Sequence, residues 1–382
     1  MKRLLILTDW FEPAFKAGGP VRSCTNLAQA MSDTYEVFVL TGDRDFGDSQ
    51  PFQNIVFDQW IEFQPGVKVF YLSEERQTFK GIKEAILLAT PDILYLNSMY
   101  SVNFTLKPLL LHLRHQISGK LFLAPRGMLH AGALQYKSIK KKAFLLLFRI
   151  FAIEKRIHWH ATDQQEMQDI KRVFPKAANI SLISNLPVSE QAPFESLKKE
   201  KGLLRIAFIS RISPKKNLDY LLRALQSVKS SIFLEIAGPI ESEAYWKNCQ
   251  ELIDKLPTNI KTSYLGAADQ QEVVHILKKN HIFVLPTHGE NFGHGIFESL
   301  VVGKPVVISH LTPWQDLQER HAGLLCVLDD ARDLAKQIEH FAVQEDISYT
   351  VWAKGAWDYA NDFLRNADLP NQYNQMFRLY GG

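Results

Sequence analysis

Short apolar runs alternate with helical patterns along most of this chain, and this alternation restricts the fold more than any other feature. Apolar runs of about four to eight residues between turn signals are typical of buried strands. Strands that alternate with helices favour an α/β architecture with parallel sheets. The strands expected in the first half lie at residues 3–8, 36–40, 92–97, 120–124, 157–162 and 180–184. Those expected in the second half lie at residues 204–210, 232–237, 260–265, 281–285, 305–309 and 323–327.

A polar, proline-containing stretch at residues 187–202 interrupts this pattern near the middle of the chain. Such stretches are typical of linkers between domains. A chain of 382 residues is long enough for two or three domains that each bury a core. We therefore expect one α/β domain at residues 1–186 and a second that begins at residue 203.

The composition is that of a soluble globular protein, with 46% apolar and 22% charged residues. The three cysteines, Cys24, Cys249 and Cys326, are too few and too far apart for a disulfide framework or a metal cluster, so we expect a reduced, cytoplasmic protein. The apolar start of the chain is followed by Asp9 and Glu12, which favours a first strand over a signal peptide. No apolar run is long enough to cross a bilayer.

Basic residues are concentrated in one part of the sequence. No acidic residue lies between Asp92 and Glu154, whereas nine basic residues do: Lys107, Arg114, Lys120, Arg126, Lys137, Lys140, Lys141, Lys142 and Arg149. Residues 136–149 begin with lysines and continue as an apolar run. Two interpretations stay open for them: a core helix with a solvated first turn, or a helix that docks on an anionic membrane surface from the cytoplasmic side. Nucleic acid is disfavoured because no exposed aromatic pattern or binding motif accompanies the charges.

Two glutamates, Glu290 and Glu298, flank a glycine-containing turn between an expected strand and a short helical pattern. Glu290 is then on the loop at the carboxyl end of the strand, and Glu298 is about one turn inside the helix. The N–H groups of residues 292–295 lie at the helix start, where a pyrophosphate can bind without a lysine. Taken alone, the same spacing also fits a loop glutamate and a solvated helix glutamate.

Four motifs, taken in order, give a more specific indication. They are Gly18-Gly19-Pro20; Asn185-Leu186-Pro187; residues 209–218, with Arg211 and Lys216; and residues 285–307, with both glutamates. This series resembles the signatures of family 4 retaining glycosyltransferases. The resemblance implies the GT-B fold, in which two Rossmann-like domains face each other across a cleft. It also implies a nucleotide-sugar domain at residues 203–356 and a last helix, at residues 357–382, that returns to the first, acceptor-side domain.

The resemblance implies a nucleotide diphosphate sugar, linked to UDP or GDP, as the donor and no cofactor. Arg211 and Lys216 would contact the diphosphate, where negative charge builds as the glycosidic bond breaks. Glu290 would hold hydroxyls of the transferred sugar, and Glu298 the ribose. The other substrate contacts implied are Gly18, Gly19, Asn185, Phe292, Gly293, His294 and Gly295. The resemblance implies no carboxylate nucleophile. It also implies that the departing phosphate oxygen helps deprotonate the acceptor on the same face, so neither glutamate would be a general base.

The chain departs from the family pattern after the strand at residues 120–124. Many members carry a histidine there that faces the donor sugar, whereas this chain has Arg126, with His130 a few residues later. A subset of bacterial polysaccharide enzymes shares the form Pro-Arg-Gly-Met-Leu. Either Arg126 or His130 could therefore take the sugar-facing role.

No histidine or acidic motif has the spacing of a metal site, so we expect metal-independent transfer. The interpretation favoured is a hexosyltransferase of cell-surface polysaccharide or lipopolysaccharide synthesis that acts on a glycan or a lipid-linked acceptor. Two alternatives are an epimerase or phosphorylase on a similar scaffold, and a noncatalytic nucleotide-sugar-binding protein.

Overall fold

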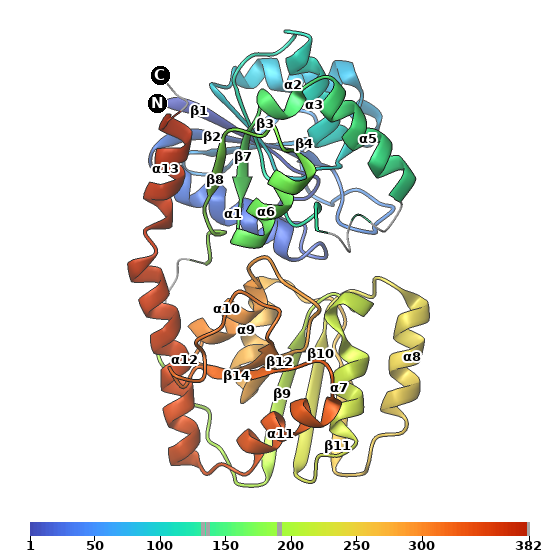
Figure 1. Ribbon diagram of the computed structural model, residues 1–382, viewed down its shortest axis with the longest axis vertical. Helices are drawn as coiled ribbons and strands as arrows, with labels where there is room; N and C mark the ends of the chain where they lie inside the picture. Colours follow the sequence, from blue (N-terminus) through green and yellow to red (C-terminus); the bar gives the residue numbers. More distant parts are fainter. Residues whose placement is uncertain (131–133, 135–137, 189–192, 380–382) are drawn as a thin grey trace. The chain divides into compact units, whose positions relative to one another are not determined.

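The structure, a computed structural model, describes residues 1–130, 134, 138–188 and 193–379. It divides the chain into two compact units, Met1–Leu186 with Asp368–Gly382, and Pro187–Ala367. In each unit, helices flank a central sheet (Figure 1). The prediction of two α/β domains with parallel sheets is confirmed.

The first unit contains an eight-stranded sheet in the order β3-β4-β2-β1-β5-β6-β7-β8. Neighbouring strands are parallel except β3 and β4, which pair antiparallel. The strands are β1 (Lys2–Leu7), β2 (Tyr35–Gly42), β3 (Trp60–Gln64), β4 (Val67–Leu72), β5 (Ile93–Leu96), β6 (Lys120–Leu123), β7 (His158–Ala161) and β8 (Ile180–Leu182). Neither β3 nor β4 was predicted from the sequence. The edge strand β3 is half-exposed and lacks a continuous apolar run, which explains why it was missed.

Helices of the first unit are α1 (Gly19–Met31), α2 (Phe79–Ala89), α3 (Lys107–Leu113), α5 (Ser138–Ile150), α6 (Gln164–Val173) and α13 (Leu369–Leu379). Short turns of helix are η1 (Glu74–Arg76), the π-helix η2 (Val102–Leu106) and η3 (Ile153–Lys155). Strand β1 from Leu4 onwards and all of β5 are buried on both faces, as expected for central strands of a parallel sheet.

The second unit contains a six-stranded parallel sheet in the order β11-β10-β9-β12-β13-β14. Its strands are β9 (Leu203–Ile209), β10 (Ser231–Ala237), β11 (Ile260–Tyr264), β12 (Ile282–Leu285), β13 (Val306–Ser309) and β14 (Gly323–Cys326). Its helices are η4 (Pro214–Lys216), α7 (Leu218–Leu225), α8 (Glu243–Ile253), α9 (Gln270–Lys279), α10 (His294–Val301), α11 (Ala331–Ala342) and α12 (Asp346–Asn366). All six strands expected in this half are present.

The C-terminal helix is not one continuous element, which corrects our expectation for residues 357–382. Helix α12 runs to Asn366 within the second unit, and only α13, from Leu369, belongs to the first unit. The break lies at Asp368, which has a φ of 39°, and Pro370 follows it. Both features oppose a continuous α-helix, because a positive φ leaves the helical region and proline cannot donate an N–H. Residues 380–382 lie outside the described residues.

The expected linker is largely part of the second unit, which begins at Pro187. Residues 189–192 lie outside the described residues. Lys199 is buried, and its Nζ donates to the carbonyl oxygens of Ala342 at 2.9 Å and Gln344 at 3.2 Å. The end of the linker is therefore packed against the end of α11.

The basic segment at residues 136–149 forms helix α5 from Ser138, while residues 136–137 lie outside the described residues. Leu145 and Phe148 are buried in the core of the first unit, where the Phe148 ring lies 5.1 Å from that of Phe174. This part of the apolar run is core, as the first of the two interpretations expects. None of the described helices is long and apolar enough to cross a membrane. All three cysteines are free and buried.

Lys304 gives a stability prediction. Its side chain follows α10 and is only 2% exposed, and burial lowers its pKa from 10.5 to about 8. Below pH 8, Lys304 is charged in both the folded and the unfolded state, so the free-energy cost of burying its charge is fully present. This cost declines as the pH rises from 8 towards 10.5, the pKa of the unfolded state. Lys304→Met should therefore stabilise the protein at pH 7, by up to about 3 kcal/mol. The gain should shrink at pH 9.5 in urea unfolding measurements, and destabilisation at pH 7 would contradict this account.

Candidate functional site

The residues of the second unit that are predicted to bind the sugar donor lie close together at one edge of its sheet. The strand order reverses between β9 and β12, since β10 and β11 lie on one side of this pair and β13 and β14 on the other. Open α/β sheets bind ligands outside the carboxyl ends of their strands at such a switch point. Arg211 and Lys216 follow the carboxyl end of β9, and Glu290 follows that of β12. The topology thus brings the two main sequence motifs together.

Backbone hydrogen bonds connect the loops that follow these two strands. The carbonyl oxygen of Lys215 accepts the N–H of His288 at 2.9 Å and the hydroxyl of Thr287 at 3.2 Å. Ser309, at the end of β13, donates its hydroxyl to the carbonyl of Thr287 at 2.6 Å. The turn before α7 and the loop after β12 are therefore held in a fixed register. Sequence patterns gave no role to Thr287 or Ser309.

Lys216 and Glu290 form an ion pair with 2.5 Å between Nζ and Oε1, and their side chains are only 14% and 11% exposed. Burial alone would raise the pKa of the Glu290 carboxyl, but the charge and hydrogen bond of Lys216 hold that pKa below its usual value. Glu290 is consequently a carboxylate at neutral pH. A pair with this little exposure is far less screened by water and salt than a surface pair.

Arg211 lies beside Glu241, with 3.0 Å between a guanidinium nitrogen and a carboxylate oxygen. Both side chains are about one-third exposed, at 31% and 37%. A single parallel bridge between Ile212 and Ile240 places the two loops next to each other beyond β9 and β10. Glu241 was not anticipated, because no local pattern marks the partner of a loop arginine.

The start of α10 has the geometry expected for the turn between the two glutamates. Gly293 is the N-cap with a φ of 82°, where any side chain would be strained and a Cβ would lie 2.8 Å from Ile296. Gly295 lies close to β9, since a Cβ there would be 3.6 Å from the carbonyl oxygen of Ile209. His294, buried, begins the helix, and Glu298 lies half-buried one turn later.

The ring of Phe292 is buried beside Trp314, with 5.2 Å between the ring centroids. The Trp314 indole donates to the Phe292 carbonyl oxygen at 2.6 Å. A substrate contact from Phe292 would therefore come from its backbone. Asp316 accepts the Tyr359 hydroxyl at 2.5 Å, so both Trp314 and Asp316 have packing roles.

In the first unit, Arg126 and Asn185 are brought together but His130 has different partners. The Arg126 guanidinium donates to Asn97 at 2.6 Å, to Tyr95 at 2.9 Å and to Asn185. Asn185 is buried, so its side chain is used within the unit. The backbone of Arg126 has a φ of 55°, which is unusual for a non-glycine residue.

His130 is held by a buried carboxylate. Its Nδ1 contacts Asp169, which also pairs with Arg172 at 2.5 Å. The imidazole is 31% exposed. Among the described residues, no hydrogen-bond partner is assigned to its Nε2. A carboxylate on one ring nitrogen fixes the orientation of the other nitrogen.

The predicted glycines lie at the start of α1. Gly18 is the N-cap with a φ of 68°, and Gly19 begins the helix, with Pro20 in its first turn. A Cβ at Gly18 would meet no atom within 4 Å, so there is space for a side chain. Glycine is favoured there because of the positive φ. Within the described ranges, no group of three or more His, Cys, Asp or Glu side chains could hold a metal ion.

Comparison with known proteins finds a family match that lies almost entirely within the second unit. Residues 189–356 match the family model "Glycosyl transferases group 1". A D-inositol 3-phosphate glycosyltransferase of Saccharomonospora viridis is 25% identical over 187 residues, which cover 46% of this chain and 43% of the relative. The chain spans about half the length of the curated relatives it matches.

Solved structures of other proteins are similar to almost the entire chain. The Anabaena protein HepE, in complex with UDP-glucose, matches with a TM-score of 0.71 and 16% identity over 99% of both chains. WaaG, a glycosyltransferase involved in lipopolysaccharide biosynthesis, matches with a TM-score of 0.61 and 13% identity over 100% of both chains. The fold is therefore GT-B, as the sequence motifs predicted.

Proposed function

We propose that this protein is a retaining, metal-independent hexosyltransferase that uses a nucleotide diphosphate sugar. Its acceptor is a glycan or a lipid-linked sugar in the synthesis of cell-surface polysaccharide. The group 1 match of residues 189–356 supports the transferase class. The Pro125-Arg126-Gly127-Met128-Leu129 segment and the likeness to WaaG support the polysaccharide role.

The contact between Lys216 and Glu290 carries this proposal. In the proposed roles, Lys216 binds the diphosphate and Glu290 binds hydroxyls of the transferred sugar. The bond that breaks lies between those two parts of the donor, so groups that serve them should be neighbours. Their 2.5 Å contact at the switch point meets this requirement.

The chemistry follows from where charge develops. As the bond from the sugar to the phosphate oxygen breaks, the diphosphate gains negative charge, which Arg211, Lys216 and the start of α10 stabilise. The acceptor oxygen forms its new bond to the same sugar carbon on the same face. Its proton passes to the departing phosphate oxygen, so neither glutamate acts as a base or a nucleophile. Glu298 binds the ribose.

In the first unit, Gly18 and Gly19 contact the phosphate or the transferred sugar. Of the two candidates for the sugar-facing role, the contacts favour His130. Three hydrogen bonds already engage the Arg126 guanidinium, whereas the Asp169 contact orients His130 with Nε2 directed away from it. Arg126 then contributes indirectly, because its hydrogen bond holds the Asn185 side chain in position.

The donor is linked to UDP or GDP. The HepE structure is a complex with UDP-glucose, which favours UDP for a chain of the same fold. The presence of Arg211, Lys216 and Glu290 favours a transferase over the noncatalytic alternative. The group 1 match likewise favours a transferase over an epimerase or a phosphorylase.

A nucleotide-sugar panel tests the proposal. A donor at a hundred times its dissociation constant should raise the free energy of unfolding by about 2.7 kcal/mol, which thermal shift detects. The selected donor, mixed with a glycan or lipid-linked acceptor and a chelator, should release nucleotide diphosphate and give a product with the donor's anomeric configuration. Binding without release would favour the noncatalytic alternative, and an inverted product would exclude retention.

Glutamine substitutions should separate the roles of the two glutamates. Glu298→Gln should weaken the binding of free nucleotide diphosphate, by about tenfold for one lost charge-assisted hydrogen bond. Glu290→Gln should leave that binding nearly unchanged and impair sugar transfer. Calorimetry with nucleotide diphosphate alone measures the first effect. An equal loss of affinity in both variants would rule out separate roles.

We also propose that the first unit attaches to an anionic membrane surface, where a lipid-linked acceptor would lie. The end of α5 exposes Leu146, Ile150 and the following Phe151, which are 57%, 64% and 65% exposed. These residues, and not the buried Leu145 and Phe148, supply the apolar contact that the sequence pattern suggested for the whole run.

The charges around this apolar patch, Leu146, Ile150 and Phe151, suit an anionic partner. Arg149 donates to the carbonyl oxygen of Val173 at 2.6 Å, which places the end of α6 beside it. From residue 141 to residue 176, the ionisable side chains described as exposed are all basic: Arg149, Lys155, Arg156, Lys171, Arg172 and Lys176. The acidic residues of this stretch are buried or half-buried: Glu154, Asp163, Glu166 and Asp169.

Liposome sedimentation tests this attachment. Leu146→Ser/Ile150→Ser/Phe151→Ser should weaken binding to anionic vesicles by at least about tenfold, because burial of each large apolar side chain contributes about 1.5 kcal/mol or more. Lys140→Glu/Lys141→Glu/Lys142→Glu should weaken it as well, and added salt should lower the wild-type binding. Leu88→Ser, at another exposed leucine, is the matched control. Equal sedimentation of all variants, or none of the wild type, would contradict membrane attachment.

A further inference from the structure

The loop that leads to Gly18, residues 9–18, is packed against the loop that follows β2. Phe46, in the second loop, lies edge-on to Trp10 in the first, with 5.4 Å between their ring centroids. Phe46 and Trp10 also pack on a small apolar cluster that includes Ala14, Ala17 and Val21. The two loops therefore share an apolar contact of their own, separate from the main core.

Asp45 makes the polar connection between these loops. Its side chain is buried, and one carboxylate oxygen accepts the N–H groups of Phe15 at 2.8 Å and Lys16 at 3.0 Å. The other oxygen accepts the N–H of Phe46 at 2.6 Å. Hydrogen bonds to a charged acceptor are about twice as strong as neutral ones. Asp45 thus fixes two consecutive peptide groups of the loop before α1.

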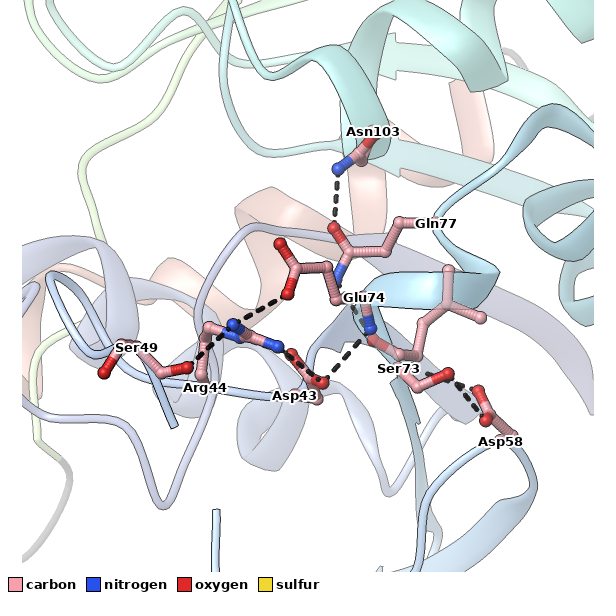
Figure 2. Close-up of polar contacts among 9 residues, drawn as sticks. Asp43, Arg44, Ser49, Asp58, Ser73, Glu74, Gln77 and Asn103 are labelled. Carbon is pink, nitrogen blue, oxygen red and sulfur yellow. Dashed lines mark hydrogen bonds and ion pairs between the residues drawn. The ribbon is translucent and has the colours of Figure 1, made fainter. Parts of the chain in front are cut away.

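The loop that carries Asp45 is itself held at its base, as Figure 2 shows. The buried Asp43 carboxylate accepts a hydrogen bond from Arg44 Nε at 2.9 Å and another from the backbone N–H of Glu74 at 3.1 Å. Arg44 donates further to the carbonyl oxygen of Ser49 at 3.1 Å and pairs with the Glu74 carboxylate at 2.9 Å. This network ties the loop to η1, just beyond the carboxyl end of β4, so Asp45 is supported from a rigid part of the sheet.

Asp45 fixes the position of Phe15, and Phe15 in turn fixes the position of the glycine turn. The Phe15 carbonyl oxygen accepts the N–H of Gly18 at 2.9 Å, and Gly18 is the N-cap of α1. We propose that Asp45 is a positioning residue for the Gly18–Gly19 turn. It holds that turn where its backbone meets the donor, and it does not itself contact substrate. This inference rests on the proposed function of the two glycines.

Hydrogen exchange measures the positioning directly, without any substrate. In Asp45→Ala, the amides of Phe15 and Lys16 lose their acceptor, and their exchange should become about tenfold faster. Asp45→Asn keeps one acceptor oxygen without its charge and should give a smaller increase. Asp48→Asn is the matched control, because Asp48 is a carboxylate of the same loop that pairs with the partly exposed Lys16 ammonium at 2.6 Å. Exchange equal to wild type in Asp45→Ala would overturn the proposal.

Kinetics then distinguish positioning from general destabilisation. Asp45→Ala should lower kcat by about tenfold to a hundredfold, because small displacements of a substrate-contacting turn are costly. It should leave the affinity for free nucleotide diphosphate, bound by the second unit, within about twofold of wild type. A kcat close to wild type despite faster exchange would also overturn the proposal. If the wild type transferred no sugar, the proposed function would fail, while the exchange comparison would still decide the role of Asp45.

Discussion

The Lys216–Glu290 ion pair connects the two motifs on which the account of this protein depends. The residues are 74 positions apart, and the parallel order of β9 and β12 brings their loops to the same edge of the sheet. A buried charge is costly unless a partner and hydrogen bonds compensate it. The charge of Lys216 therefore keeps Glu290 a carboxylate at the place where the diphosphate sugar is proposed to bind. The same contact fixes the second unit locally and gives the proposed donor site its polarity.

The first unit is organised by polar contacts of a different kind. Buried or half-buried side chains there hold backbone groups and one another at the carboxyl ends of the strands: Asp43 and Asp45 on the loop after β2, and Arg126 between Asn97 and Asn185. Helix α13 completes this region, where the Tyr373 hydroxyl donates to the Ser184 carbonyl at 3.2 Å. A rigid edge of this kind suits a turn that must meet a ligand with its backbone.

Much of the architecture was predictable from sequence, because buried parallel strands have continuous apolar runs, and turn residues lie between these runs. The motifs around Arg211, Lys216 and Glu290 could be placed at strand ends for the same reason. The pairing of Arg211 with Glu241 could not be predicted, because it depends on tertiary structure. The same holds in the first unit for the hydrogen bonds of Asp45 to the loop before α1. The break near Asp368 was foreseeable from Pro370, whereas the burial of Leu145 beside the exposed Leu146 requires knowledge of which helix face meets the sheet.

The most direct test of the central claim is the single-turnover rate of sugar transfer in Lys216→Ala, with Lys215→Ala as its matched control. Lys215 is the adjacent lysine, and its side chain is exposed. Loss of a charge that stabilises the leaving diphosphate should slow transfer by about a hundredfold in Lys216→Ala. Lys215→Ala should stay within about threefold of wild type. Equal rates in the two variants, whether both normal or both slow, would contradict the role assigned to the Lys216–Glu290 pair.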